Sequence, residues 1–148
     1  MGPAKRRYLA HFRTSCAAGN KFASQTTAQM QALIGQISRG DLSAVVRLQR
    51  YLQILSHAFA TGLSRMRSLG PPPEPDASYG RAYITAAGRM VAAIQHLGRA
   101  VGKLDAPGIA TANGELKAAS TAANTAARRY GFQTCGSAPA SPATGLIA

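Results

Sequence analysis

The sequence predicts an all-α protein, an up-down-up-down four-helix bundle with a disordered C-terminal tail. Apolar residues recur every three or four positions along four stretches of the chain, which is the spacing of one helix face. No stretch shows the strict apolar-polar alternation of a half-buried strand. The connections between the stretches are short, apart from one proline-rich loop, and short connections favour antiparallel neighbours.

Length and composition are those of one small domain. The 148 residues are 46% hydrophobic and 15% charged, so the chain is apolar enough to fold and not charged enough to be disordered throughout. We expect the bundle over residues 1–135. The remaining residues, 136–148, read GSAPASPATGLIA, a small, proline-containing and nearly uncharged segment that is typical of a disordered tail.

The first two helices are expected over residues 5–39 and 41–70. Gly40 is a suitable end for the first helix, and Asp41 is a good N-cap for the second. The second helix ends near Gly70, because the four prolines at positions 71, 72, 73 and 75 cannot continue it. The apolar faces consist of Tyr8, Phe12, Cys16, Gly19, Phe22, Thr26, Met30, Leu33 and Ile37, and of Val45, Leu48, Leu52, Leu55, Phe59, Leu63 and Met66.

The third and fourth helices are expected over residues 76–104 and 105–131. Asp76 and Asp105 are placed to cap them, and Gly131 ends the fourth helix. The fourth helix presents mainly alanine to the core, which predicts a close approach of its backbone to a neighbour. The apolar faces consist of Tyr79, Tyr83, Ala86, Met90, Ile94, Leu97, Val101 and Leu104, and of Ile109, Ala112, Leu116, Ala119, Ala123, Ala126 and Tyr130.

The two cysteines, Cys16 and Cys135, are far apart in the sequence. The fourth helix is expected to start at the end of the bundle where the first helix ends, near Gly40. At about 1.5 Å of rise per residue it then runs back far enough to bring Cys135 within reach of Cys16. We therefore expect a disulfide, which would indicate an oxidising compartment. The alternative is two unrelated thiols, with Cys16 a small buried core residue. Two cysteines without a nearby histidine pair fall short of a zinc site, so no metal ligand is predicted.

The charge balance is strongly basic, with 17 Lys and Arg against 5 Asp and Glu and a formal net charge of +12. The basic residues of the third helix fall within about 80° of arc opposite its apolar face, and those of the second helix are arranged similarly. They are candidates for binding a polyanion, such as an anionic lipid surface, an envelope polymer or a nucleic acid. The alternative is a solvated face that keeps the protein soluble. These candidates are Arg81, Arg89, Arg99, Lys103, Arg47, Arg50 and Arg65.

Catalytic patterns are missing from the sequence. Three of the five acids sit at expected N-caps, and no pair is placed for two-carboxylate chemistry. None of the histidines His11, His57 and His96 has an acid or a second ligand three or four residues away. The sequence contains no Walker loop, no GxSxG and no HExxH. We therefore predict no catalytic residue, no cofactor and no enzymatic activity.

The chain resembles a class of small exported actinobacterial proteins of unknown function, some of them lipoproteins. The resemblance rests on the early cysteine in YLAHFRTSCAAGNKFA, the turn LGPPPEP, the aromatic stretch YGRAY, and the closing AARRYGFQTCG. It spans roughly residues 8–136 and implies a helical bundle with a Cys16–Cys135 bridge outside the cytoplasm. It implies no activity. Those proteins usually carry a leader, often with a lipid-attachment cysteine, and this sequence has neither.

Taken together, the sequence predicts a monomeric, non-enzymatic binding or interaction protein that is extracellular or associated with the cell envelope. The alternative is a cytoplasmic protein that binds nucleic acid through its basic helix faces. A second alternative is a small-molecule binder with a pocket between helices near Tyr79, Tyr83 and Phe59. No stretch approaches the roughly 18 unbroken apolar residues of a membrane span. The loop from Pro71 to Pro75 is interpreted as a rigid turn rather than a docking segment.

Overall fold

A computed structural model describes residues 1–132 and, of these, the side chains of residues 1–13 and 28–132. The helices of this region are α1 (Pro3–Ser38), α2 (Ser43–Ser68), α3 (Ala77–Gly102) and α4 (Ala106–Tyr130). They pack into a bundle, and residues 1–132 contain no strand, so the all-α prediction is confirmed. The predicted tail at 136–148 lies outside the described residues, so the tail and the helix count of the whole chain stay predictions.

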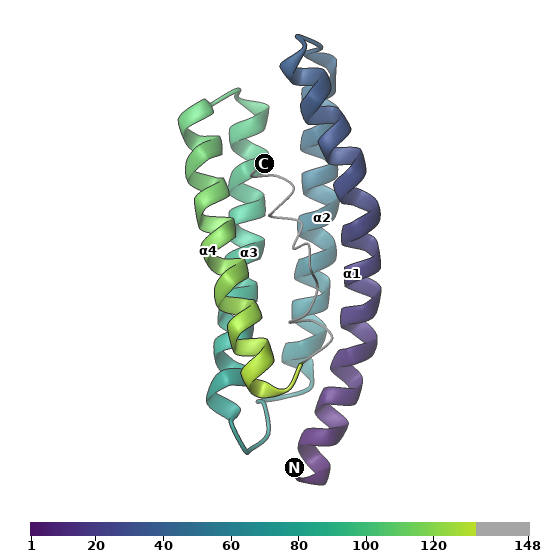
Figure 1. Ribbon diagram of the computed structural model, residues 1–148, viewed down its shortest axis with the longest axis vertical. Helices are drawn as coiled ribbons and strands as arrows, with labels where there is room; N and C mark the ends of the chain where they lie inside the picture. Colours follow the sequence, from purple (N-terminus) through teal and green to yellow (C-terminus); the bar gives the residue numbers. More distant parts are fainter. Residues whose placement is uncertain (133–148) are drawn as a thin grey trace.

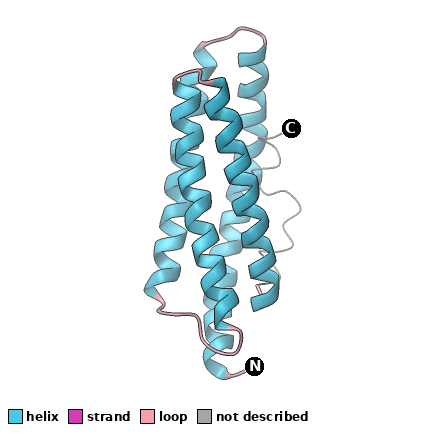
Figure 2. Ribbon diagram, turned by 90° about the vertical axis from the view of Figure 1, so that its left-hand side faces the viewer, coloured by secondary structure: helices cyan, strands magenta, loops and turns pink. Residues whose placement is uncertain are grey.

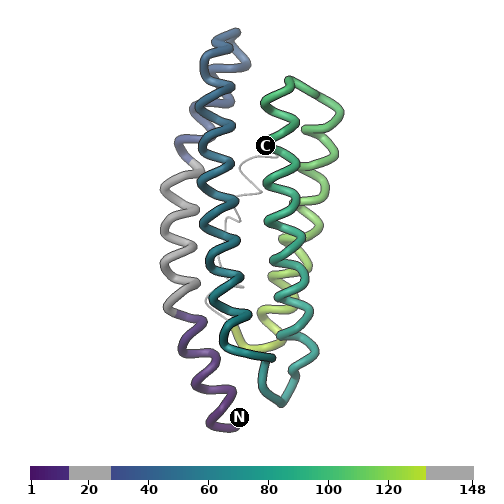
Figure 3. Tube along the Cα trace, turned by 180° about the vertical axis from the view of Figure 1, so that it is seen from behind, coloured from purple at the N-terminus to yellow at the C-terminus, as the bar shows by residue number. Residues whose placement is uncertain are grey.

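The bundle is built from two helical hairpins that stand side by side (Figure 1). Among the described residues, the backbones of α1 and α2, of α2 and α3, and of α3 and α4 approach one another closely. Successive helices run antiparallel, so the turns at residues 39–42 and 103–105 lie at one end of the bundle (Figure 2). The N-terminus, the loop between α2 and α3 and the end of α4 lie at the other end (Figure 3).

Turn residues set most of the helix ends. Gly40, Gly70 and Gly131 have positive φ angles of 91°, 84° and 109°, which glycine adopts without steric cost, and each follows a helix closely. The Asp105 carboxylate accepts a hydrogen bond from Gly108 N at 3.1 Å, so the predicted cap of α4 is confirmed. Asp41 lies two residues before α2 and accepts a hydrogen bond from Ser43 N at 3.1 Å.

The buried side chains form two clusters. One lies among all the helices and is centred on residues such as Leu52, Leu55, Ile94 and Leu116. The other, at the end that carries the proline loop, is largely aromatic. The predicted apolar faces supply most of both clusters. Leu104 is an exception, because α3 ends at Gly102 and Leu104 is 56% exposed in the turn that follows.

Candidate functional site

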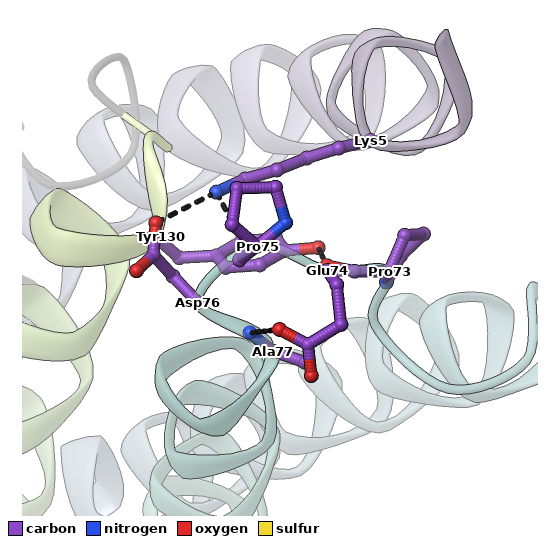
Figure 4. Close-up of polar contacts among 7 residues, drawn as sticks. All are labelled: Lys5, Pro73, Glu74, Pro75, Asp76, Ala77 and Tyr130. Atoms are coloured by element: carbon purple, nitrogen blue, oxygen red, sulfur yellow. Dashed lines mark hydrogen bonds and ion pairs between the residues drawn. The ribbon is translucent and has the colours of Figure 1, made fainter. Parts of the chain in front are cut away.

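The side chain of Lys5 is buried at the N-terminal end of α1 and touches the loop before α3 (Figure 4). It is 5% exposed, and its Nζ atom donates hydrogen bonds to Pro75 O at 2.8 Å and to Asp76 Oδ2 at 3.2 Å. The same ammonium lies 4.4 Å from the centre of the Tyr130 ring, a cation–π contact. The charge is thus held by groups of the protein itself, which indicates a structural role.

Asp76 occupies the N-cap position of α3, but its side chain makes no capping hydrogen bond. Its φ angle is 69°, in the left-handed region that Asp tolerates better than most residues, and its carboxylate binds Lys5 instead. The Glu74 carboxylate takes over the capping role by accepting a hydrogen bond from Ala77 N at 3.4 Å. The prediction that Asp76 caps the third helix is therefore wrong in its side-chain contact, because a long-range ion pair competes for the carboxylate.

An aromatic cluster lies next to Lys5, whose ammonium group contacts the Tyr130 ring. We define the cluster as Tyr8, Phe12, Tyr83, Tyr130 and Phe132. The Phe12 and Phe132 ring centroids are 3.7 Å apart, and Tyr8 meets Tyr130 edge to face at 6.0 Å. The Tyr130 hydroxyl donates a hydrogen bond to Pro73 O at 2.9 Å. Burial raises the pKa of Tyr83 and that of Tyr130 to about 12 in each case. The hydrogen bonds from Lys5 on α1 to Pro75 O and from Tyr130 on α4 to Pro73 O hold the proline loop (residues 71–75) in place. These contacts favour the rigid-turn interpretation.

The seven predicted polyanion-binding residues are all exposed and come from two adjacent helices. We call them the basic surface: Arg47, Arg50 and Arg65 on α2, and Arg81, Arg89, Arg99 and Lys103 on α3 and at its C-terminal end. The register of the two helices follows from three glycines of α3. Gly88 faces Leu63, Gly98 faces Leu52 and Gly102 faces Gln49. By this antiparallel register, Arg65 lies about three residues from the depth of Arg89, and Arg50 about two residues from the depth of Arg99.

The basic surface is nearly free of internal charge compensation. Arg47 Nη2 lies 3.5 Å from Asp41 Oδ2, and it also donates a hydrogen bond to Gln36 Oε1 at 2.9 Å. None of the other members forms an ion pair within the part of the chain whose side chains the structure describes. The remaining carboxylates are used elsewhere: Glu74 and Asp105 at helix starts, Asp76 on Lys5, and Glu115 on His96.

His96 and Glu115 come together across α3 and α4, although the sequence places no acid near His96. His96 Nδ1 lies 3.0 Å from Glu115 Oε2, with side chains 34% and 51% exposed. The pair joins the two helices at the surface. Among the described side chains, no three His, Asp or Glu residues gather as metal ligands would.

A cavity of about 180 Å³ lies among the helices near the turns at residues 39–42 and 103–105. At the other end of the bundle lie Tyr83, a member of the aromatic cluster, and Tyr79, which packs beside it, whereas Phe59 packs against the larger core cluster. The cavity is lined by Ile34, Ile37, Ser38, Val45, Leu48, Leu52, Leu97, Val101, Leu104, Ile109 and Asn113.

Sequence reasoning missed two residues that belong to these sites. Lys5 lies three residues before Tyr8, on the same face of α1, and Asn113 lies between Ile109 and Leu116 on the apolar face of α4. A polar residue on an apolar helix face is the signal that would have singled out both. The predicted Cys16–Cys135 disulfide lies outside the described residues, which include neither Cys135 nor the Cys16 side chain.

None of the described helices has the length and apolar character that crossing a membrane requires. Comparison of the chain with protein families, with curated proteins and with solved structures finds no match.

Proposed function

We propose that this protein is a non-enzymatic binding protein that holds a phosphate-bearing polyanion on its basic surface. The observation that carries the proposal is the lack of compensation: apart from Arg47, the members of the basic surface have no carboxylate partner among the described side chains. Six of its seven members therefore present their charge to solvent without a carboxylate partner, on a chain with a formal net charge of +12.

The residue types and their positions suit phosphate. Six of the seven members of the basic surface are arginines, whose planar guanidinium group can donate two parallel hydrogen bonds to phosphate oxygens. The four members on α3 fall within about 80° of arc, so they share one side of that helix. A polymer or surface that offers many phosphates can then engage several members together. An anionic lipid surface, an envelope polymer and a nucleic acid share this chemistry.

Charge reversal on α3 tests the proposal. The variant Arg81→Glu/Arg89→Glu/Arg99→Glu changes three exposed side chains. A matched control, Arg13→Glu/Lys117→Glu/Arg128→Glu, applies the same charge change to exposed positions on α1 and α4. Binding to phosphatidylglycerol vesicles and to a short DNA duplex is measured for both. We expect the α3 variant alone to lose binding while both variants keep wild-type helicity. Equal losses in the two variants, or none in either, would remove the basic surface from the account.

The two probes also distinguish the partners that we consider. Binding to vesicles favours an anionic lipid surface, which fits our first proposal of an extracellular or cell-envelope protein that is a monomeric four-helix bundle with a disordered tail. Binding confined to DNA favours the cytoplasmic alternative.

A Cys16–Cys135 disulfide is the second part of the envelope proposal. Phe12 and Phe132, whose rings are in contact, support it. Cys16 lies one helical turn, about 5.4 Å of rise, beyond Phe12. Cys135 is three residues beyond Phe132, a reach of about 10 Å in extended chain. The intact mass of the alkylated, unreduced protein from its native source tests this. We expect a chain two hydrogens light with no alkylated thiol, and two alkylated thiols would contradict the bridge.

A further inference from the structure

Exposed apolar side chains gather at the start of α2 and in the turn that follows α3. Among the described residues, six large hydrophobic side chains are exposed, and four of them lie here. We call these four the apolar row: Leu42, Val46 and Ile54 along α2, and Leu104 in the turn. Their side chains are 46–69% exposed. Leu104 and Val45 line the same cavity, so the turn lies beside the start of α2.

Helix geometry interleaves the apolar row with arginine. Val46, Arg50 and Ile54 follow one another at steps of four residues, each of which rotates by only about 40° on an α-helix. All three are exposed, so Arg50 lies between two aliphatic side chains on the outward face of α2. The exposed Arg47 lies on the same face. This face of α2 is therefore apolar and basic at once.

Helix α3 adds two cations at the same level of the bundle. Gly102 of α3 faces Gln49 of α2. By this antiparallel register, Arg99 and Lys103 lie at the depth of residues 46–54. Neither of these cations forms an ion pair among the described side chains. Members of the basic surface therefore flank the apolar row on both helices.

Leu104 is unfavourable in two ways in the turn that it occupies. Its φ angle of 52° lies in the left-handed region, which glycine usually occupies after a helix end and which is costly for a residue with a Cβ atom. More than half of its side chain is also exposed to water. A partner that offers hydrocarbon would remove the second of these costs.

The mixture of aliphatic and basic side chains indicates the class of partner. Protein interfaces take most of their binding energy from buried anchors such as Trp, Tyr and Arg, and leucine and valine are under-represented among these anchors. A nucleic acid offers phosphates, but its charged backbone gives aliphatic side chains little to pack against. An anionic bilayer offers headgroup phosphates with hydrocarbon directly beneath them. Aliphatic side chains can insert there while arginine side chains extend back to the headgroups.

We propose that the start of α2 and the turn after α3 lie on an anionic lipid bilayer, with the apolar row inserted below the headgroups. This inference rests on the proposed function and names its partner, a lipid surface rather than a nucleic acid. Arg50, Arg99 and Lys103 then bind headgroup phosphates around the inserted side chains. Insertion of this kind reaches about 5–10 Å into the bilayer and needs no spanning helix.

Removing the hydrocarbon without changing the charge tests the insertion. In Val46→Gln/Ile54→Gln, glutamine replaces two exposed β-branched residues and is a better helix former than either. Thr121→Gln/Thr125→Gln makes a matched change at exposed positions on α4. We expect the α2 variant alone to bind phosphatidylglycerol vesicles about tenfold more weakly, through loss of two partly buried aliphatic side chains. Any affinity for the short DNA duplex should stay within a factor of about two, because the charge is unchanged.

An introduced tryptophan reports on insertion directly, because the chain contains none. Val46→Trp places it in the apolar row, and Thr121→Trp places it on α4 as the control. Phosphatidylglycerol vesicles with brominated acyl chains quench a tryptophan that reaches the hydrocarbon. We expect the emission of bound Val46→Trp to shift to shorter wavelength and to be quenched, and that of the control to show neither change. Unshifted and unquenched emission from bound Val46→Trp would overturn the insertion.

The outcomes distinguish this inference from the proposed function on which it rests. If the α2 variant binds vesicles as the wild type does, or loses vesicle and duplex binding alike, the insertion is refuted and the basic surface stands. Wild-type binding confined to the duplex has the same consequence. Wild-type binding to neither probe, or an α3 charge reversal without effect, would remove the proposed function and this inference with it.

Discussion

Lys5 Nζ lies 3.2 Å from Asp76 Oδ2, although 70 residues separate the two in the chain. The contact joins the start of α1 to the start of α3. The Lys5 side chain is 5% exposed and that of Asp76 is 51% exposed, so water still reaches the carboxylate. Removing the lysine therefore leaves a carboxylate that can be rehydrated, whereas Pro75 O loses a donor.

We expect Lys5→Met to lower the free energy of unfolding by about 1–2 kcal/mol, through loss of hydrogen bonds from a charged donor. Methionine keeps the length of the apolar stem, so packing against Tyr130 is preserved. Urea unfolding measures the change. Arg7→Met, at an exposed position two residues away, should stay within about 0.5 kcal/mol of the wild type. Similar losses in the two variants would show that Lys5 contributes no more than a surface cation.

The hydroxyl groups of Tyr8 and Tyr130 differ in a way that mutation can resolve. Both are buried in the aromatic cluster, but Tyr130 donates to Pro73 O, whereas the Tyr8 hydroxyl has no partner among the described residues. Tyr130→Phe should cost about 1 kcal/mol of unfolding free energy, and Tyr8→Phe should be neutral or stabilising. Thermal unfolding of the two variants checks the order. A larger loss in Tyr8→Phe than in Tyr130→Phe would contradict it.

The pKa of Tyr83 predicts a loss of stability in alkali. Burial raises that pKa from its ordinary value of 10.0 to about 12, so the unfolded state loses its proton first as the pH rises. Between these values the folded state binds more protons than the unfolded state, and stability therefore falls with increasing pH. Tyr83→Phe should flatten this fall. Urea unfolding from pH 9 to pH 12 measures it, and parallel curves for variant and wild type would be the contrary result.

Two glycines within helices should respond oppositely to alanine. A Cβ atom at Gly80 would lie 2.5 Å from Pro72 Cβ, whereas one at Gly114 would meet nothing within 4 Å. Gly114→Ala should stabilise the protein by about 0.5–1 kcal/mol through helix propensity. Gly80→Ala should destabilise it by about 1–3 kcal/mol, because α3 must move away from the proline loop. Chemical denaturation ranks the two, and a stabilising Gly80→Ala would mean that the loop moves freely.

The helices could be predicted from the sequence because their signals are local. Apolar spacing, the stops at Gly40 and Gly131, and the cap at Asp105 all act within a few residues, and the structure confirms these helices with ends shifted by one or two residues. The partners of Asp76 and His96 could not be predicted, because each lies on another helix and depends on how the helices pack. The place of Asn113 in the wall of a cavity could not be predicted for the same reason.

The basic surface could be predicted in part. The arc of Arg81, Arg89, Arg99 and Lys103 follows from helix geometry, and the structure confirms that all are exposed. The lack of compensation could not be predicted, since it depends on where each of the five acids finds a partner.

The salt dependence of binding tests the central claim most directly. The affinity of the wild-type protein for the short DNA duplex and for phosphatidylglycerol vesicles is measured from about 50 to 200 mM salt. If the basic surface contacts phosphates, the affinity for at least one of the two falls steeply. For DNA, the slope against the logarithm of salt concentration shrinks by about 2–3 in the Arg81→Glu/Arg89→Glu/Arg99→Glu variant, if residual binding is measurable. Absence of binding to both probes at the lowest salt concentration, or an affinity that does not change with salt, would contradict the account.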